Sequence, residues 1–283
     1  MAGVMSGLTA EGRDLTSFAP APVRRRGAPI RVQVLVLTLR SIKVLVLDPR
    51  MILLNAMGPL LMLLIFSQIF GSISATPQFP RGVSYIDFLV PAIMVNSAMQ
   101  AALQTGISLT QEVRSGIISR FRSLPIWLGS ILFARSLADL VRSGLQLICV
   151  LLFAYALFGF SPAGGISGVF AAWILALTVG GGIGWLFIAL ACWIRNIDLF
   201  QGTTMLVTFP LMFASSAFVP VGGFPEWLRF VATLNPMTYG IDATRALVFG
   251  HPVGYGPLVA VVLSLVTIGF SAAVAVRGFR RPL

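Results

Sequence analysis

The sequence predicts an all-α membrane protein with six transmembrane helices, and two observations lead to that fold class. Of the 283 residues, 57% are hydrophobic and 10% are charged, and the mean hydropathy is +0.92, outside the range of ordinary soluble domains. Residues 143–194 contain no Asp, Glu, Lys or Arg. That run is about twice the roughly 20 apolar residues that cross a bilayer. A turn rich in Gly and Pro at 159–165 divides it into two spans.

Charge-free apolar stretches of spanning length recur along the chain, and they set the expected helices. Asp48 and Pro49 suit the N-cap and first turn of the first helix. Pro59, Pro91 and Pro210 fall inside spans, where neighbouring helices can satisfy the carbonyl groups that proline leaves free. The six expected spans are 51–70, 88–108, 132–158, 169–193, 199–219 and 257–276.

Basic residues are unevenly distributed among the loops, which predicts the orientation. The chain carries 20 Lys and Arg against 9 Asp and Glu, a formal charge of +11, and one side of the expected topology has only Arg81, Arg229 and Arg245. Basic residues collect on the cytoplasmic side, where anionic membrane lipid attracts them. We therefore expect both termini to be cytoplasmic and no nucleic-acid partner. The preference for Arg over Lys favours a GC-rich bacterial source, and hence a bacterial inner (plasma) membrane.

The two ends of the chain differ from the spans in composition. Residues 1–29 are rich in Gly, Pro and Arg and lack the apolar core of a secretory signal, which predicts a disordered cytoplasmic tail. Residues 278–283 form a second cytoplasmic tail. The segment 30–47 is apolar but interrupted by polar and basic residues, so we expect an interfacial helix on the inner leaflet rather than a span.

Residue types typical of catalytic and metal sites are scarce. Lys43 is the only lysine, and it does not follow a glycine-rich turn, so the chain has no P-loop for nucleotide hydrolysis. His251 is the only histidine and cannot hold a metal ion alone. Cys149 and Cys192 lie within apolar spans and are expected to be packing thiols. We expect neither an enzyme nor a bound cofactor or metal.

The loop after the second span carries a short amphipathic element at 111–125. On a helix, Ile117, Phe121 and Leu124 share one face, flanked by charged side chains, and Pro125 ends the element. Such an element at the edge of a membrane is suited to docking on a partner. A solvated connecting loop is the alternative.

Polar side chains inside the spans are candidates for a transport pathway, because hydrocarbon disfavours them. Asn96, Gln100, Gln104 and Ser108 recur every fourth residue in the second span and form one helical stripe. We take this stripe as the candidate translocation surface. Hydrogen bonding between helices of one subunit is the alternative.

Two further patterns in the spans favour structural roles. Arg135, Asp139 and Arg142 occur at i, i+4 and i+7 near the inner end of the third span, which predicts an ion-pair ladder. The glycines at 180–182 and Gly184 permit close approach of neighbouring helices.

The last outer loop predicts two short helices, at 225–233 and 236–249. Asn235 and Pro236 make a sharp break between them, and Gly250 ends the second. Asp242 and Arg245 are spaced to pair, which would lower the free-energy cost of placing them near lipid. These helices are expected to be either re-entrant or interfacial.

Three segments together resemble the permease subunits of ABC-type-2 exporters, especially the daunorubicin-resistance type, over nearly all of 30–276. The first segment is the pattern of Glu112, Gly116, Arg120, Phe121 and Pro125. The second is 85–91, and the third comprises 218–220, 224–228 and 235–239. The family usually has Gly after the proline at 91, whereas this chain has Ala92.

The resemblance implies a type-2 ABC exporter transmembrane domain at 30–277 and assigns roles to several residues. It implies an ABC ATPase subunit as partner, which would bind ATP and Mg, and a second permease copy or a homologous permease. The expected ATPase-coupling residues are Glu112, Arg114, Gly116, Arg120, Phe121 and Pro125. The expected outer-gate residues are Pro220, Pro225, Trp227, Asn235, Pro236 and Tyr239.

The expected function is therefore export of an amphipathic or hydrophobic compound, a drug or a lipid, out of the cytoplasm or inner leaflet. A permease for polysaccharide or glycolipid is one alternative. An ion-coupled secondary transporter is disfavoured, because such proteins need ionisable groups near the membrane centre. Here the acidic residues Asp87, Asp139, Asp198 and Glu226 lie near span ends or in loops.

Overall fold

The computed structural model describes residues 29, 32, 34–36, 38–39, 49–75, 79, 82–114, 128–194, 196–251 and 254–279. These residues form helices and no strand, which confirms the all-α membrane fold. The helices are α2 (Pro49–Phe70), η2 (Gly71–Ala75), α3 (Tyr85–Arg114), α5 (Leu128–Phe158), α6 (Gly165–Trp193), α7 (Ile197–Phe213), η3 (Val221–Gly223), α8 (Glu226–Leu234), α9 (Pro236–Phe249) and α10 (Gly256–Phe279).

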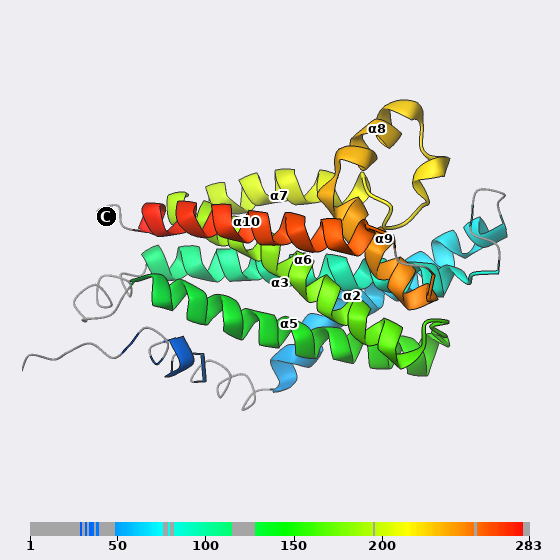
Figure 1. Cartoon of the computed structure of the whole chain (residues 1–283), viewed down its shortest axis with the longest axis horizontal. Coiled ribbons are helices and arrows are strands. Elements are labelled where there is room, and N and C mark those ends of the chain that lie inside the picture. The colour runs from blue at the N-terminus through cyan, green and yellow to red at the C-terminus, as the bar shows by residue number, and fades with distance from the viewer. Residues whose placement is uncertain are drawn as a thin grey trace, which may run out of the picture.

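The long helices run side by side along the molecule (Figure 1). The C-terminal ends of α3, α6 and α10 lie at one end, with the starts of α5 and α7, while α8 and α9 lie toward the other. Helix α3 is largely buried, whereas α2 and α10 expose most of their apolar side chains. Since lipid solvates apolar side chains, this exposure suits outer helices of a membrane bundle.

Five of the described helices, α2, α3, α5, α6 and α10, are long and apolar enough to cross a membrane. The fifth expected span, 199–219, is shorter than predicted, because α7 ends at Phe213 and not at residue 219. Its 17 residues extend about 25 Å, against a hydrocarbon core of about 30 Å. The Asn235 side chain donates to the carbonyl groups of Leu211 and Ala214, at 2.8 and 2.7 Å, and so satisfies the end of α7 from another segment.

The glycines of α6 allow neighbouring helices to approach closely, as predicted. A Cβ on Gly180 would lie 2.5 Å from the Cβ of Ala98 on α3, and one on Gly182 would lie 3.2 Å from Ser264 on α10. Both distances are shorter than ordinary van der Waals contact. Helix α6 therefore packs between α3 and α10, with Gly180 on the side facing α3 and Gly182 on the side facing α10.

Pro59 within α2 frees a backbone carbonyl group, and a neighbouring helix satisfies it, as expected for a proline in a span. Pro59 has no N–H group, which leaves the carbonyl of Asn55, four residues earlier, without its helical donor. The Nε2 of Gln146 on α5 donates to that carbonyl at 3.1 Å. The polar groups of α2 and α5 thus satisfy one another inside the bundle.

The predicted interfacial helix at 30–47 lies mostly outside the described residues. Residues 32, 34–36 and 38–39 are helical. The Thr38 hydroxyl is within 3.3 Å of the carbonyl of Ala134 on α5, to which it donates, while Leu35 and Val36 are exposed. Its depth relative to a membrane stays a prediction.

Candidate functional site

The polar stripe of α3 lines a cavity between α2, α3 and α5. Three of its four predicted members face this cavity, whose volume is about 390 Å³. Asn96 is buried, at 5% exposure, while Gln100 and Gln104 are exposed. The polar lining comprises Asn55 from α2, Asn96, Ser97, Gln100 and Gln104 from α3, and Arg142 and Gln146 from α5.

The floor of this cavity holds polar atoms without a partner among the described residues. Asn96 donates through Nδ2 to the sulfur of Met62, at 3.4 Å, a weak acceptor. Its Oδ1 and the hydroxyl of Ser97 are buried and have no hydrogen-bond partner there. Buried polar atoms are usually hydrogen-bonded, so these two atoms could gain a partner if their side chains turned toward the cavity.

Ser108, the fourth member of the stripe, belongs to a separate cluster. Arg135 on α5 donates to the Ser108 hydroxyl at 2.6 Å and to the Glu112 carboxylate at 2.5 Å. Both acceptors are on α3, and Arg135 is not paired with Asp139. The predicted three-residue ladder along α5 is therefore wrong in one rung: the ion pair of Arg135 crosses from α5 to α3.

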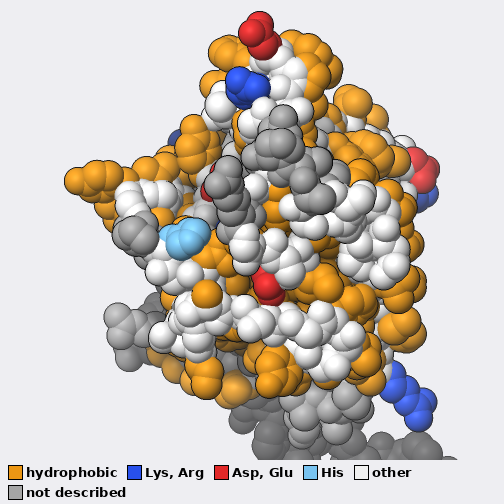
Figure 2. Space-filling view, turned by 90° about the vertical axis from the view of Figure 1, so that its right-hand side faces the viewer, with side chains coloured by type: hydrophobic (Ala, Val, Ile, Leu, Met, Phe, Trp, Pro, Cys, Tyr) orange, Lys and Arg blue, Asp and Glu red, His pale blue; other side chains and the backbone are white. Residues whose placement is uncertain are grey.

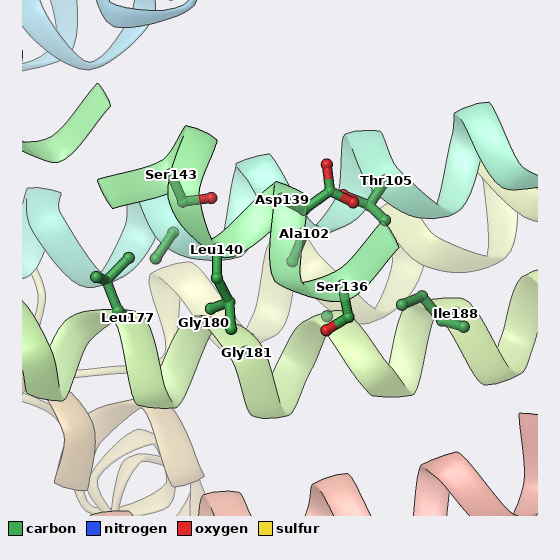
Figure 3. A pocket seen from close by; sticks show the side chains of 12 residues that line it. Ala102, Thr105, Ser136, Asp139, Leu140, Ser143, Leu177, Gly180, Gly181 and Ile188 are labelled. Atoms are coloured by element: carbon green, nitrogen blue, oxygen red, sulfur yellow. The ribbon is translucent and has the colours of Figure 1, made fainter. Parts of the chain in front are cut away.

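The remaining rung forms as predicted. Arg142 pairs with Asp139 at 3.1 Å and lies 3.5 Å from the Thr105 hydroxyl of α3. Asp139 and Thr105 line a small cavity between α3, α5 and α6 (Figure 3). At about 20 Å³ it has room for one water molecule. One carboxylate oxygen of Asp139 is buried beside it without a partner in the described residues.

The predicted coupling residues are only partly described. Glu112 and Arg114 close the C-terminal end of α3. Gly116, Arg120, Phe121 and Pro125 lie outside the described residues. The structure adds that Glu112 is bound to α5 through Arg135, so any force on the end of α3 also acts on α5.

The outer segment contains the two predicted helices, α8 and α9. Asn235 caps α9 by accepting from the Met237 N–H at 2.9 Å, Pro236 occupies its first turn, and Gly250 ends it in the left-handed conformation. The hydroxyl of Tyr239 donates to the Thr233 carbonyl at 2.8 Å. Figure 2 looks onto this end, where hydrophobic and uncharged polar side chains predominate and charged side chains are isolated.

The other predicted outer-gate residues lie around α8. Pro225 precedes its first turn, Pro220 precedes η3, and Trp227 is exposed. A broad apolar groove lies between α7 and α8, and its lining includes Phe209, Phe213 and Trp227.

Arg245 on α9 connects three segments at this end of the molecule. It pairs with Asp242 at 2.8 Å, as predicted, and donates to the carbonyl groups of Phe88 and Ser216, at 3.2 and 2.9 Å. Its guanidinium group lies over the Phe88 ring, 3.6 Å from the centroid. Sequence reasoning found the ion pair but missed Phe88 and Ser216, because no local spacing relates them to α9.

Comparison with known proteins agrees with this architecture. The family model of the ABC-2 type transporter matches residues 32–249. The chain belongs to the ABC-2 type transporter family. The family match confirms the predicted resemblance. With five helices long and apolar enough to cross a membrane among the described residues, the chain is a multi-pass membrane protein.

Two of the following three relatives of this ABC-2 chain are named as ABC transporter permease proteins. It is 32% identical over 192 residues to the daunorubicin resistance ABC transporter permease protein DrrB1 of Streptomyces coeruleorubidus, covering 68% of this chain and 66% of that protein. It is 26% identical over 230 residues to the probable doxorubicin resistance ABC transporter permease protein DrrC of Mycobacterium tuberculosis, covering 79% of each. Nodulation protein J of Rhizobium leguminosarum bv. trifolii is 29% identical over 181 residues, 61% of this chain and 65% of that protein.

Proposed function

We propose that this chain is the transmembrane permease subunit of an ATP-driven ABC exporter. The observation that carries the proposal is the ABC-2 family match over residues 32–249, which takes in α2 to α9 of the helical bundle. The proposed location is a bacterial inner membrane with both termini in the cytoplasm, as the distribution of basic residues favours. ATP and Mg would bind to a separate ATPase subunit.

The bundle is expected to form half of a transport pathway. A second copy of the chain, or a homologous permease, would supply the other half, and two ATPase subunits would complete the complex. Closure of the ATPases on ATP would move the segment from Glu112 to Pro125. The Glu112 to Arg135 ion pair supports transmission of that movement to both α3 and α5.

The proposed translocation surface is the α3 stripe of Asn96, Gln100, Gln104 and Ser108. Three of these residues line a polar cavity, which supports contact with cargo, whereas Ser108 is engaged by Arg135. The outer helices α8 and α9 are proposed to gate the exit. Replacing Gln100 and Gln104 by Leu should reduce export while ATPase subunits still assemble on the permease.

For cargo we propose an amphipathic or hydrophobic compound, a drug or a lipid. The names of the DrrB1 and DrrC relatives and the apolar character of the spans support this class. Polysaccharide or glycolipid is the alternative, and a secondary transporter is a less favoured one.

The energy source is tested in inside-out vesicles that contain the permease and its ATPase. Accumulation of a fluorescent, uncharged amphipathic compound should stop when ATP is depleted. It should continue when ionophores collapse the membrane potential and the pH gradient. Accumulation that follows the gradients and not ATP would refute an ABC exporter.

A further inference from the structure

The cavity between α2, α3 and α5 has the construction of a binding site within a single subunit. Its volume of about 390 Å³ lies in the range of small-molecule sites, roughly 300–1,000 Å³. Asn55, Gln100 and Gln104 are exposed, so the cavity opens to the side of the bundle, while Asn96 and Ser97 are 5% and 2% exposed and lie at its floor.

The polar side chains of the lining indicate which groups a ligand must offer. Asn96 Oδ1 is an acceptor and requires a donor, and the Ser97 hydroxyl can donate or accept. Both atoms are fully buried and have no partner among the described residues, so a ligand reaches them only when these side chains turn toward the cavity. The exposed amides of Gln100 and Gln104 supply further donors and acceptors at the opening. A group that both donates and accepts, such as a hydroxyl, suits all four side chains.

The charge of the cavity indicates that this group is uncharged. Arg142 is the charged residue of the lining, and its guanidinium is paired with Asp139 at 3.1 Å. A bound anion would compete with Asp139, and a cation would be repelled by the guanidinium. Leu54 and Leu61 of α2 are exposed and lie four residues before and three residues after Gly58 of the lining, hence on the same face of the helix, where they suit the hydrophobic part of the same molecule.

We propose that this cavity binds the uncharged, hydroxyl-bearing group of an amphipathic molecule, such as a sugar or polyol, whose apolar part lies along α2. The inference rests on the proposed function, since it names the polar part of the cargo. It places the first binding site inside one permease subunit, before any pathway between two subunits is reached.

Photolabelling tests the site on the full chain in phosphatidylcholine nanodiscs. The probe is monoglucosyl diacylglycerol with a diazirine on the glucose. The comparison probe is phosphatidylethanol, an anionic lipid without a headgroup hydroxyl, with the same acyl chains and a diazirine on its ethyl group. The glucosyl probe should label residues of the cavity about tenfold more than the anionic probe, as roughly one or two net hydrogen bonds would produce. Equal labelling by both probes would overturn the proposal.

Two glycine substitutions provide a matched pair. Gly58 lines the cavity, Gly269 lies on α10 outside it, and a Cβ on either would meet no atom within 4 Å. Gly58→Phe should fill the cavity and reduce labelling about tenfold, whereas Gly269→Phe should leave it unchanged. Asn96→Leu should reproduce the effect of Gly58→Phe. Undiminished labelling in Gly58→Phe, or equal loss in both glycine variants, would contradict the site.

A hexyl glucoside carrying the same diazirine distinguishes the sources of the hydroxyl group. Labelling by the lipid alone supports a membrane glycolipid, labelling by both supports small hydroxylated amphipaths as well, and labelling by neither overturns the site. No ATPase is present in this measurement. Loss of ATP-driven export would therefore refute the proposed function without affecting the labelling result.

Discussion

Arg245 shows how a single side chain can hold together segments that are distant in the sequence. Its guanidinium bonds the start of α3 at Phe88, the chain after α7 at Ser216, and Asp242 on its own helix. The residue is 8% exposed. A cation buried to this extent is tolerated only when it is paired and hydrogen-bonded, and each of these partners contributes to that condition.

Arg245→Met is expected to destabilise the outer end of the bundle. It keeps much of the apolar side chain but removes the donor to the Ser216 carbonyl and the additional donor to the Phe88 carbonyl, which should cost about 2 kcal/mol. The measurement is the thermal unfolding midpoint of the detergent-solubilised chain. Arg229→Met is the control, because Arg229 is an exposed arginine whose bonds to Gly222 and Phe224 lie at the surface. An equal decrease in both variants would show that burial of Arg245 is unimportant.

Helix α6 is the element on which the packing of its neighbours depends. Gly180 lets α6 approach α3, and Gly182 lets it approach α10, more closely than a larger residue would without a shift of the neighbouring helix. The high glycine content of this segment therefore has a specific cause in helix packing. Interiors are as densely packed as organic crystals, so added volume at the contact must displace a helix.

Gly180→Ala is expected to separate α3 from α6 and to destabilise the chain by about 1–3 kcal/mol. Ala98→Gly removes the methyl group that the new Cβ would strike. The double variant should therefore recover part of the loss in unfolding midpoint, as a double-mutant cycle measures. Gly269→Ala, in open space, is the control and should change little. Strictly additive effects of Gly180→Ala and Ala98→Gly would argue against direct contact.

The ion pair between Glu112 and Arg135 also connects two helices, α3 and α5. Glu112 lies in the last turn of α3, close to the proposed ATPase contact, and forms an ion pair with Arg135. Its carboxylate thus has a contact inside the subunit beside the proposed contact with the partner. Because Glu112 is partly exposed, the ion pair is expected to contribute no more than about 1 kcal/mol to stability.

Exchange of the two charges separates these contacts. Glu112→Arg with Arg135→Glu should restore the ion pair, and with it the unfolding midpoint that Glu112→Arg alone decreases. If Glu112 also contacts the ATPase, the double variant should still fail to couple ATP hydrolysis to export. Stability is measured in reconstituted complexes as the unfolding midpoint, and coupling is measured there as export per ATP hydrolysed. Full recovery of coupling in the double variant would show that Glu112 acts only through its ion pair inside the subunit and does not contact the ATPase.

At the scale of the whole molecule, the two ends of the bundle differ in charge. Arg114 and Arg277 lie at the end that holds the C-termini of α3 and α10, and the sequence has eight more basic residues at 1–50, before the first expected span. The helices of the opposite end have two bases, Arg229 and Arg245, against Glu226 and Asp242. This distribution of basic residues supports an orientation with α8 and α9 outside the cell.

Reporter fusions test this orientation. A reporter that is active only in the cytoplasm should be active when fused after Leu283, and one inserted after Gly223 should be inactive. An exported reporter, alkaline phosphatase, should give the reverse pattern at the same two positions. Phosphatase activity at Leu283 would invert the topology and with it the proposed direction of export.

Much of this architecture follows from local features of the chain. Apolar runs of spanning length predict α2, α3, α5, α6 and α10, and the Asn235 cap and Gly250 predict the limits of α9. The sequence predicts these features because helix length, capping and glycine conformation depend on residues close in sequence. The family resemblance depended on motifs of the same local kind.

Other features depend on how the helices are rotated against one another. The partner of Arg135 is Glu112 and not Asp139, α7 ends where the Asn235 amide reaches its carbonyl groups, and the polar cavity forms only where α2 and α5 meet the α3 stripe. Helical spacing places a side chain on a face, but it does not say which helix that face meets. Long-range hydrogen bonds and packing settle that question, because polar groups away from water are stable only beside a partner.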